Sequence, residues 1–240
     1  MWGYEFQGLV TALGYSRCNE ALELLIDMAK SEEKRLEGIA GDWIDAVANI
    51  GTPEANRTIL SFIDPDIEKH SLSLTFDYFH QERLASKIAT IAGDDPLVRY
   101  RLLFLCTKKL PPQMRLLLAD CVTRLGTRDG ILAGLDLIHD DATPSIPPAL
   151  IRNLEAVFVE RRPYGSSETT YTLEPQSAND IRSHLFDMAV TDESRKHSAW
   201  TILAQIESWR IEYGRPTNEP RHPNIESGIS WPPTNLLANT

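Results

Sequence analysis

The adjacent side chains of His139 and Asp140 are the pair in this sequence most typical of metal chemistry. Such a pair can hold a metal ion that activates water for phosphate ester hydrolysis, provided that a second histidine lies upstream and a further aspartate downstream. The nearest upstream candidate is His80, which lies in a segment without a helical pattern. A metal phosphohydrolase is therefore the third and least favoured interpretation, and we predict no metal ligand.

Other catalytic signatures are missing from the sequence. It contains no G-x-S-x-G, H-E-x-x-H, C-x-x-C or G-x-G-x-x-G pattern, which removes the common hydrolase, zinc-protease, redox and dinucleotide-binding interpretations. Cys18, Cys106 and Cys121 are widely spaced on apolar helical patterns, which favours reduced, buried thiols. We predict that the chain is not an enzyme, has no catalytic residue and uses no cofactor.

Charge is distributed unevenly along the chain. The 34 acidic and 24 basic residues give a net charge of -10, which argues against a dedicated nucleic-acid binder. Residues 16–54 are mainly acidic, whereas residues 96–128 carry a single acid, Asp120. The cations of this second segment, here called the basic band, are Arg99, Arg101, Lys108, Lys109, Arg115, Arg124 and Arg128. The basic band is either a solvated helix face or a surface that attracts an anionic partner.

Helical patterns that end in an aliphatic run and a glycine recur along the first 130 residues. The glycines are Gly14, Gly51, Gly93 and Gly126. Each glycine is expected to end its helix, because glycine adopts the left-handed conformation without a Cβ clash. A second apolar run follows each one, and the pairs Thr52-Pro53 and Asp95-Pro96 are typical helix starts. A pair of helices is therefore repeated about every 40 residues.

The stretch AVANIGTPEANRTILSFI, from Ala46 to Ile63, resembles the HEAT-like repeat, in which one helix ends in an Ile-Gly turn and Pro-Glu-Ala opens the next. The resemblance is specific in this unit, looser in the others, and covers roughly residues 5–140. It implies an all-α fold, an α-solenoid of stacked antiparallel helix pairs, with a concave surface suited to a partner. The lining would come from the second helix of each pair.

Two further features complete the expected organisation. Residues 70–79 alternate apolar and polar side chains, which allows a small β insert. We expect HEAT-like repeats over residues 1–142, helices that continue or cap the solenoid over 143–213, and a proline-rich extended tail over 214–240. Helices are expected at about 148–161, 178–190 and 193–213.

The C-terminal block WTILAQIESWRIEYGRPTNEPRHP is similar to the end of bacterial NACHT-type signalling proteins. This weaker resemblance covers about 30 residues and implies a stand-alone repeat protein or the sensor end of a longer one. The nucleotide-binding loop of such proteins, G-x-x-x-x-G-K-[ST], does not occur in this sequence.

The first expectation for function is a non-enzymatic scaffold or sensor module that binds a protein or peptide, possibly an acidic one. The alternative is a HEAT-like nucleic-acid-binding or repair protein that uses the basic band. No signal sequence and no long apolar run occurs, so we expect a cytoplasmic protein that does not associate with membranes. The candidate partner-binding residues are Arg57, Arg99, Arg101, Lys108, Lys109 and Arg115, with Glu23 and Asp27 as further candidates on the concave surface.

Overall fold

The computed structural model describes residues 3–31, 39–67, 78–140, 146, 148–159 and 175–213. Helices account for 81% of these residues, and no strand occurs among them. The predicted all-α fold is confirmed. Residues 70–77 of the β insert expected at 70–79 lie outside the described residues, and the last two, Tyr78 and Phe79, begin a helix. The expected tail, residues 214–240, also lies outside the described residues.

The chain divides into two compact units between Leu125 and Gly126. The sequence analysis set the division at residue 142 instead. The two divisions differ by one helix, α9 (Arg128–Asp136), whose Ile131 and Leu135 are buried in the same apolar core as Leu185 and Leu203 of the second unit. Shared burial with later helices therefore assigns α9 to the second unit.

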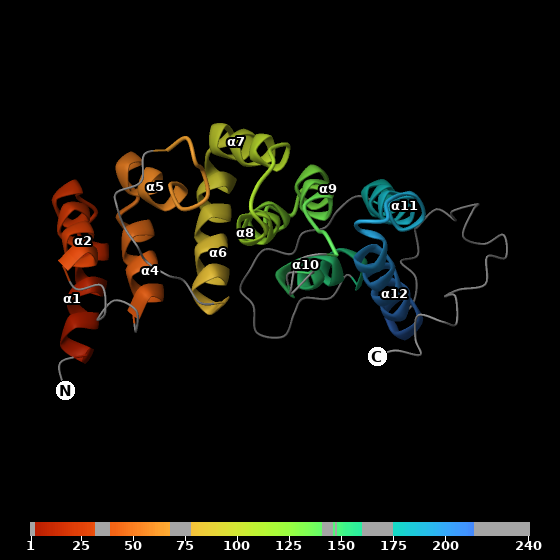
Figure 1. Cartoon of the computed structure of the whole chain (residues 1–240). Coiled ribbons are helices and arrows are strands. Elements are labelled where there is room, and N and C mark those ends of the chain that lie inside the picture. The colour runs from red at the N-terminus through yellow and green to blue at the C-terminus, as the bar shows by residue number, and fades with distance from the viewer. Residues whose placement is uncertain are drawn as a thin grey trace. The chain divides into compact units, whose positions relative to one another are not determined.

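Among the described residues of the first unit, seven helices follow one another along the chain, and Figure 1 shows how they are arranged. They are α1 (Gly3–Tyr15), α2 (Asn19–Ser31), α4 (Ala40–Ile50), α5 (Pro53–Leu60), α6 (Tyr78–Asp94), α7 (Pro96–Cys106) and α8 (Pro112–Thr123). Helices α1, α4, α6 and α8 pack on one another in that order, and α2, α5 and α7 pack against two neighbours each in this series. In this unit the second helices of the first three expected pairs, α2, α5 and α7, therefore lie on the series formed by the first helices.

Trp43 anchors the core of the first unit. Its side chain is fully buried, its Nε1–H donates to the backbone oxygen of Leu25 at 2.9 Å, and its ring meets the ring of Phe62 edge to face. A buried indole contributes most when its polar atom is also satisfied. One side chain of α4 therefore joins α2 to the segment after α5.

The predicted helix starts are confirmed. Pro53 occupies the first turn of α5, and the hydroxyl of Thr52 accepts a hydrogen bond from the Ala55 N–H at 3.3 Å. Asp95 caps α7 in the same way, with its carboxylate accepting from the Leu97 N–H at 2.9 Å. Each cap satisfies a backbone donor that the first turn of a helix leaves without a helical partner.

Two of the four glycines act as predicted, and two do not. Gly51 and Gly126 have the positive φ angles of helix-ending glycines, 69° and 63°. Gly14 instead lies within α1, where an added Cβ would come within 2.6 Å of the Ala46 Cα, so its role is the close approach of α1 to α4. Gly93 lies inside α6 with open space around it. The left-handed residue after α1 is Arg17, with φ of 55°.

In the second unit, the described residues form α9, α10 (Pro148–Val159), α11 (Pro175–Thr191) and α12 (Lys196–Tyr213). Each of the last three helices contributes an apolar face to its core, which includes Leu154, Leu185, Ile206 and Trp209. The helices expected at about 148–161, 178–190 and 193–213 are confirmed to within a few residues. None of the described helices is long and apolar enough to span a bilayer.

Candidate functional site

A network of carboxylates surrounds the turn between α11 and α12. Asp136, at the end of α9, contacts His184 Nε2 at 2.9 Å and Arg195 Nη1 at 3.1 Å through the same oxygen. The Arg195 Nε donates to Asp192 at 2.6 Å. Arg195 therefore connects the end of α9 to the end of α11.

The carboxylates of this network are held in the ionised form. Burial raises the pKa of Asp136, but its hydrogen bonds to His184 and Arg195 and their charges outweigh burial and keep the pKa below its ordinary value. The hydrogen bonds from Ser194 and then from Arg195 lower the pKa of Asp192 to about 2. A group with such a low pKa is a hydrogen-bond acceptor at neutral pH, not a general acid.

Asp140 serves as the cap of α12. Its two carboxylate oxygens accept hydrogen bonds from the His197 N–H, the Ser198 N–H and the Ser198 hydroxyl, at 2.9, 2.9 and 2.6 Å. Its own N–H donates to the Ser194 oxygen at 2.8 Å. The acid on which the least favoured interpretation, a metal phosphohydrolase, depends thus has a structural role, and the part of the chain that the structure describes contains no group of three metal-ligating side chains.

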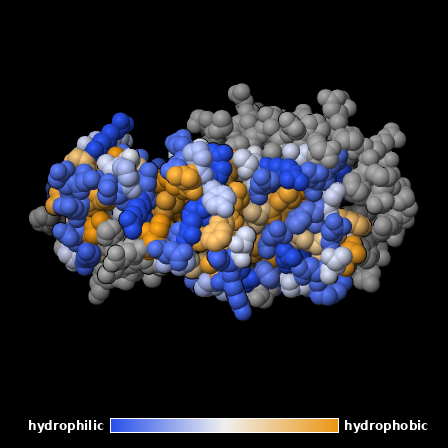
Figure 2. Space-filling model, turned by 90° about the horizontal axis from the view of Figure 1, so that it is seen from above, coloured by the Kyte–Doolittle hydropathy of each residue, from blue (hydrophilic) through white to orange (hydrophobic). Residues whose placement is uncertain are grey.

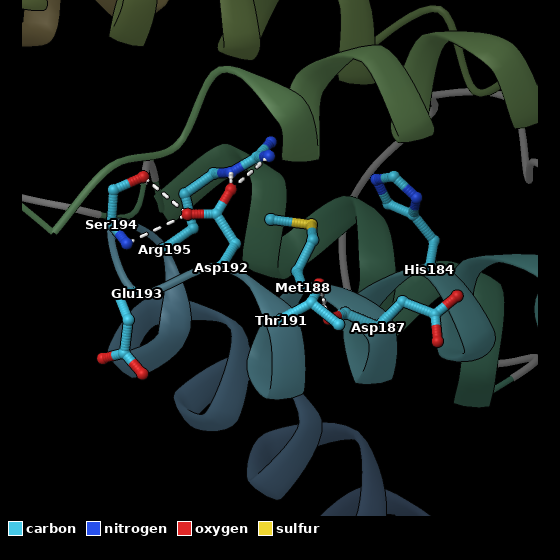
Figure 3. Close-up of a pocket in the computed structure, with 8 residues that line it drawn as sticks. All are labelled: His184, Asp187, Met188, Thr191, Asp192, Glu193, Ser194 and Arg195. Carbon is cyan, nitrogen blue, oxygen red and sulfur yellow. Dashed lines mark hydrogen bonds and ion pairs between the residues drawn. The ribbon is translucent and has the colours of Figure 1, made fainter.

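A recess of about 540 Å³ lies beside this network (Figure 3). The residues that line it are His184, Asp187, Met188, Thr191, Asp192, Glu193, Ser194 and Arg195. The Ser194 hydroxyl donates to Asp192, and Figure 3 shows Ser194 and His184 at opposite ends of the recess. The hydrogen-bond partner of this hydroxyl is therefore Asp192, whose low pKa makes it a weak base for nucleophilic catalysis.

The structure places most cations of the basic band against acids or carbonyls. Arg99 donates from Nε and Nη2 to the last carbonyls of α6, on Ala92 and Gly93, at 3.3 and 2.9 Å. Arg101 donates twice to Asp64, at 2.6 and 2.7 Å, and once to Asp66, at 2.5 Å. The guanidinium groups of these two predicted contact residues are therefore engaged in contacts within the first unit.

The two arginines at the C-terminal end of the basic band are also paired with acids. Arg124 pairs with Asp120 at 2.8 Å and with Glu82 at 3.2 Å. Arg128 pairs with Asp180 at 2.7 Å. Since these acids come mostly from other parts of the sequence, counting charges within residues 96–128 could not reveal the compensation.

The remaining predicted contact residues lie on different helices. Arg57 is exposed on α5, Lys108 and Lys109 are exposed after α7, and Arg115 is half-buried on α8. Glu23 and Asp27 are exposed on α2. Helices α2 and α5, which carry three of these residues, are second helices of the expected pairs.

Sequence reasoning missed the apolar surface of α7, here called the α7 face and made of Leu97, Tyr100 and Phe104. Leu97 is 79% exposed and Tyr100 is 72% exposed, while Leu102 and Leu105 of the same helix are buried. Positions 97, 100 and 104 lie on one side of a helix because they are three and four residues apart. The available signal was the composition of PLVRYRLLFLC, which is apolar around the whole helix.

Cations adjoin the C-terminal end of the α7 face. The Lys108 ammonium lies 4.3 Å from the centroid of the Phe104 ring, and the Arg101 guanidinium lies 5.5 Å from it. Asp94 and Asp95 are exposed at the other end. Viewed from above, the described surface is mostly hydrophilic with separate hydrophobic areas (Figure 2).

The comparison with family models matches residues 153–232 to the family described as NACHT C-terminal Alpha/Beta 2. The match covers about a third of the chain, includes most of α10 and all of α11 and α12, and agrees with the resemblance of the C-terminal block to NACHT-type proteins. No HEAT-repeat family is matched. No curated protein matches the chain, and neither does any solved structure.

Proposed function

We propose that this chain is a non-enzymatic, cytoplasmic protein-binding module of HEAT-like helix pairs, arranged as an α-solenoid. The α7 face is its binding surface. The observation that carries this proposal is the exposure of Leu97 and Tyr100 on the same side of a helix whose opposite side is buried in the first unit.

The energetics favour a partner with a helical, apolar surface. An exposed aromatic or leucine side chain gains roughly 1.5–3 kcal/mol on full burial. Side chains spaced three and four residues apart match the spacing by which amphipathic helices are recognised in protein complexes. Lys108 adds a positive charge at one end, which favours an acidic residue on the partner there.

A sensor role within a NACHT-type system is the wider setting that we propose for this module. It is supported by the match of residues 153–232 to a NACHT C-terminal family and by the two separate units of the chain. In such an arrangement the first unit would bind the partner, and the second would belong to the signalling protein.

Selection of helical peptides displayed on phage tests the proposed surface. We expect selected peptides to carry an apolar stripe and to lose at least tenfold in affinity for the Tyr100→Asp variant. The matched control is Tyr4→Asp, because Tyr4 is an exposed aromatic on α1 of the same unit. Peptides that bind wild type and Tyr100→Asp equally well would refute this surface.

The nucleic-acid alternative is tested with the same protein. Its cations would be those exposed outside ion pairs of the fold, chiefly Lys108 and Lys109. Micromolar affinity for a DNA or RNA duplex at physiological salt, lost in a Lys108→Glu/Lys109→Glu variant, would replace the protein-binding proposal, since phosphate contacts make affinity steeply dependent on salt.

A further inference from the structure

The charges that flank the α7 face have opposite signs at its two ends. Asp94 and Asp95 are exposed at the N-terminal end, and Lys108 and Lys109 are exposed at the C-terminal end. Tyr100 lies close to the middle, with Leu97 on one side and Phe104 on the other. A helix face with an apolar middle and opposite charges at its ends is complementary to an antiparallel copy of itself.

We propose that the partner of the α7 face is a second copy of this chain, bound through a two-fold axis near Tyr100. This rests on the proposed function of the α7 face. In an antiparallel pair of α7 helices, Leu97 of one copy lies opposite Phe104 of the other. Asp94 is the last residue of α6 and Lys109 follows α7 by three residues, so both lie just beyond the paired helices. The antiparallel arrangement therefore brings the acidic end of one copy next to the basic end of the other.

The symmetry doubles every contact. A two-fold interface uses the same patch on both copies, so each attraction between Asp94 and Lys109 occurs twice. Antiparallel helices also place the positive end of one helix dipole beside the negative end of the other. The acid and the base at the ends of α7 therefore select the antiparallel arrangement over the parallel one, in which like charges would meet.

The groups that surround the α7 face leave these end charges available. Arg101 is engaged by Asp64 and Asp66, and Arg99 is directed at the carbonyls that end α6. Asp95 keeps its role as the cap of α7, and Lys108 keeps its place over the Phe104 ring. Asp94 and Lys109 are thus the two positions at which charge can be reversed without disturbing a described contact.

The size of the patch sets the expected strength. One pair of short helices buries less area than the roughly 1,200 Å² at which stable interfaces begin, so the association is weak and reversible. We expect a Kd on the order of 0.1 mM, which makes the chain monomeric in dilute solution and dimeric at high local concentration.

Sedimentation velocity over a concentration series up to about 1 mM tests the dimer. We expect Tyr100→Asp to abolish it, and Lys109→Glu or Asp94→Lys to weaken it by about tenfold each, because each substitution turns two attractions into two repulsions. The matched controls are Lys30→Glu and Glu20→Lys, which make the same changes in net charge at exposed positions of α2 in the same unit.

Mixing the two reversed chains gives the decisive result. Lys109→Glu places an acid at both positions 94 and 109, and Asp94→Lys places a base at both positions, so a heterodimer of the two variants regains both contacts. Native mass spectrometry should show this heterodimer in excess of either homodimer. A wild-type chain that stays monomeric at 1 mM, or reversed chains that do not recover on mixing, would overturn the proposal.

The outcome separates this proposal from the one on which it rests. A monomeric wild type that still binds selected peptides in a Tyr100-dependent way would remove the second copy and keep the α7 face as a binding surface. A monomeric wild type without such peptides would remove both.

Discussion

The two units bury opposite members of an ion pair. In the first unit the acid is buried: the Asp64 side chain is 3% exposed, while Arg101 is 34% exposed. In the second unit the base is buried: the Arg182 side chain is 2% exposed, while its partner Glu207 is 24% exposed. A buried aspartate can become neutral by taking up a proton, but an arginine cannot lose its charge in a protein.

This difference predicts which partner is more costly to remove. Loss of the exposed member leaves the buried charge with less compensation, and that charge persists only when it belongs to arginine. Protonation can therefore neutralise the buried charge of the first unit, whereas the buried charge of the second unit persists.

The largest effect is expected for Glu207→Ala. It removes a carboxylate 2.7 Å from the buried Arg182 guanidinium and should lower the free energy of unfolding of the second unit by about 3 kcal/mol. Urea denaturation followed by hydrogen-exchange mass spectrometry would measure it, because exchange reports α11 and α12 separately from the first unit. The loss should be as large at pH 5 as at pH 8, and a loss that disappears at pH 5 would break the comparison.

Arg101→Ala should cost the first unit about 2 kcal/mol at neutral pH. The hydrogen bonds from Arg101 lower the pKa of Asp64 against burial, which raises it, so removal of Arg101 leaves a buried carboxyl with a raised pKa. Protonation then relieves the variant as the pH falls. We expect the difference between wild type and variant to shrink below about pH 5, measured by the same exchange experiment.

Arg128→Ala, at an exposed pair, should cause no measurable change.

Asp140→Ala extends the comparison to an acid whose partners include backbone N–H groups and not an arginine. Loss of the cap of α12 should destabilise the second unit by about 1–2 kcal/mol. Asp140→Asn keeps one acceptor and should recover part of the loss. Hydrogen exchange at the start of α12 is the measurement. Unchanged exchange there would contradict the capping role of Asp140, whereas stoichiometric metal lost with His139→Ala would favour a metal-site interpretation of this pair.

A smaller effect than that of Asp140→Ala is expected for Asp192, a less buried acid. Its pKa of about 2 lies below the usual value of 3.8, so its contribution to stability is complete above about pH 4 and disappears as the pH falls toward 2. Allowing for solvent screening, this contribution is about 1 kcal/mol. Wild type should lose this stability between pH 4 and pH 2, and Asp192→Asn should already lack it at pH 7. An equal acid response in both proteins would contradict the assignment.

Local signals predicted the helices well. Thr52-Pro53 and Asp95-Pro96 start helices because the capping group lies within three residues of the donor that it satisfies. The glycines were less informative. Sequence cannot distinguish a left-handed end such as Gly51 from a close contact such as Gly14, because the latter depends on Ala46 of another helix.

The site was harder to predict than the fold. The basic band was interpreted as a free surface because its acids lie elsewhere: Arg101 finds Asp64, and Arg128 finds Asp180, only after the chain has folded. The α7 face was missed for a related reason. In a helix that is apolar on all sides, periodicity does not indicate that Leu102 is buried and Leu97 exposed.

The cap on α12 also affects how the second unit folds. The carboxylate that completes the start of α12 lies 57 and 58 residues before the N–H groups that it binds. An isolated peptide with the sequence of α12 would lack it and fray at its first turn. The helix gains its cap only when the chain closes a long loop, so this start of α12 forms together with tertiary structure and is lost with it.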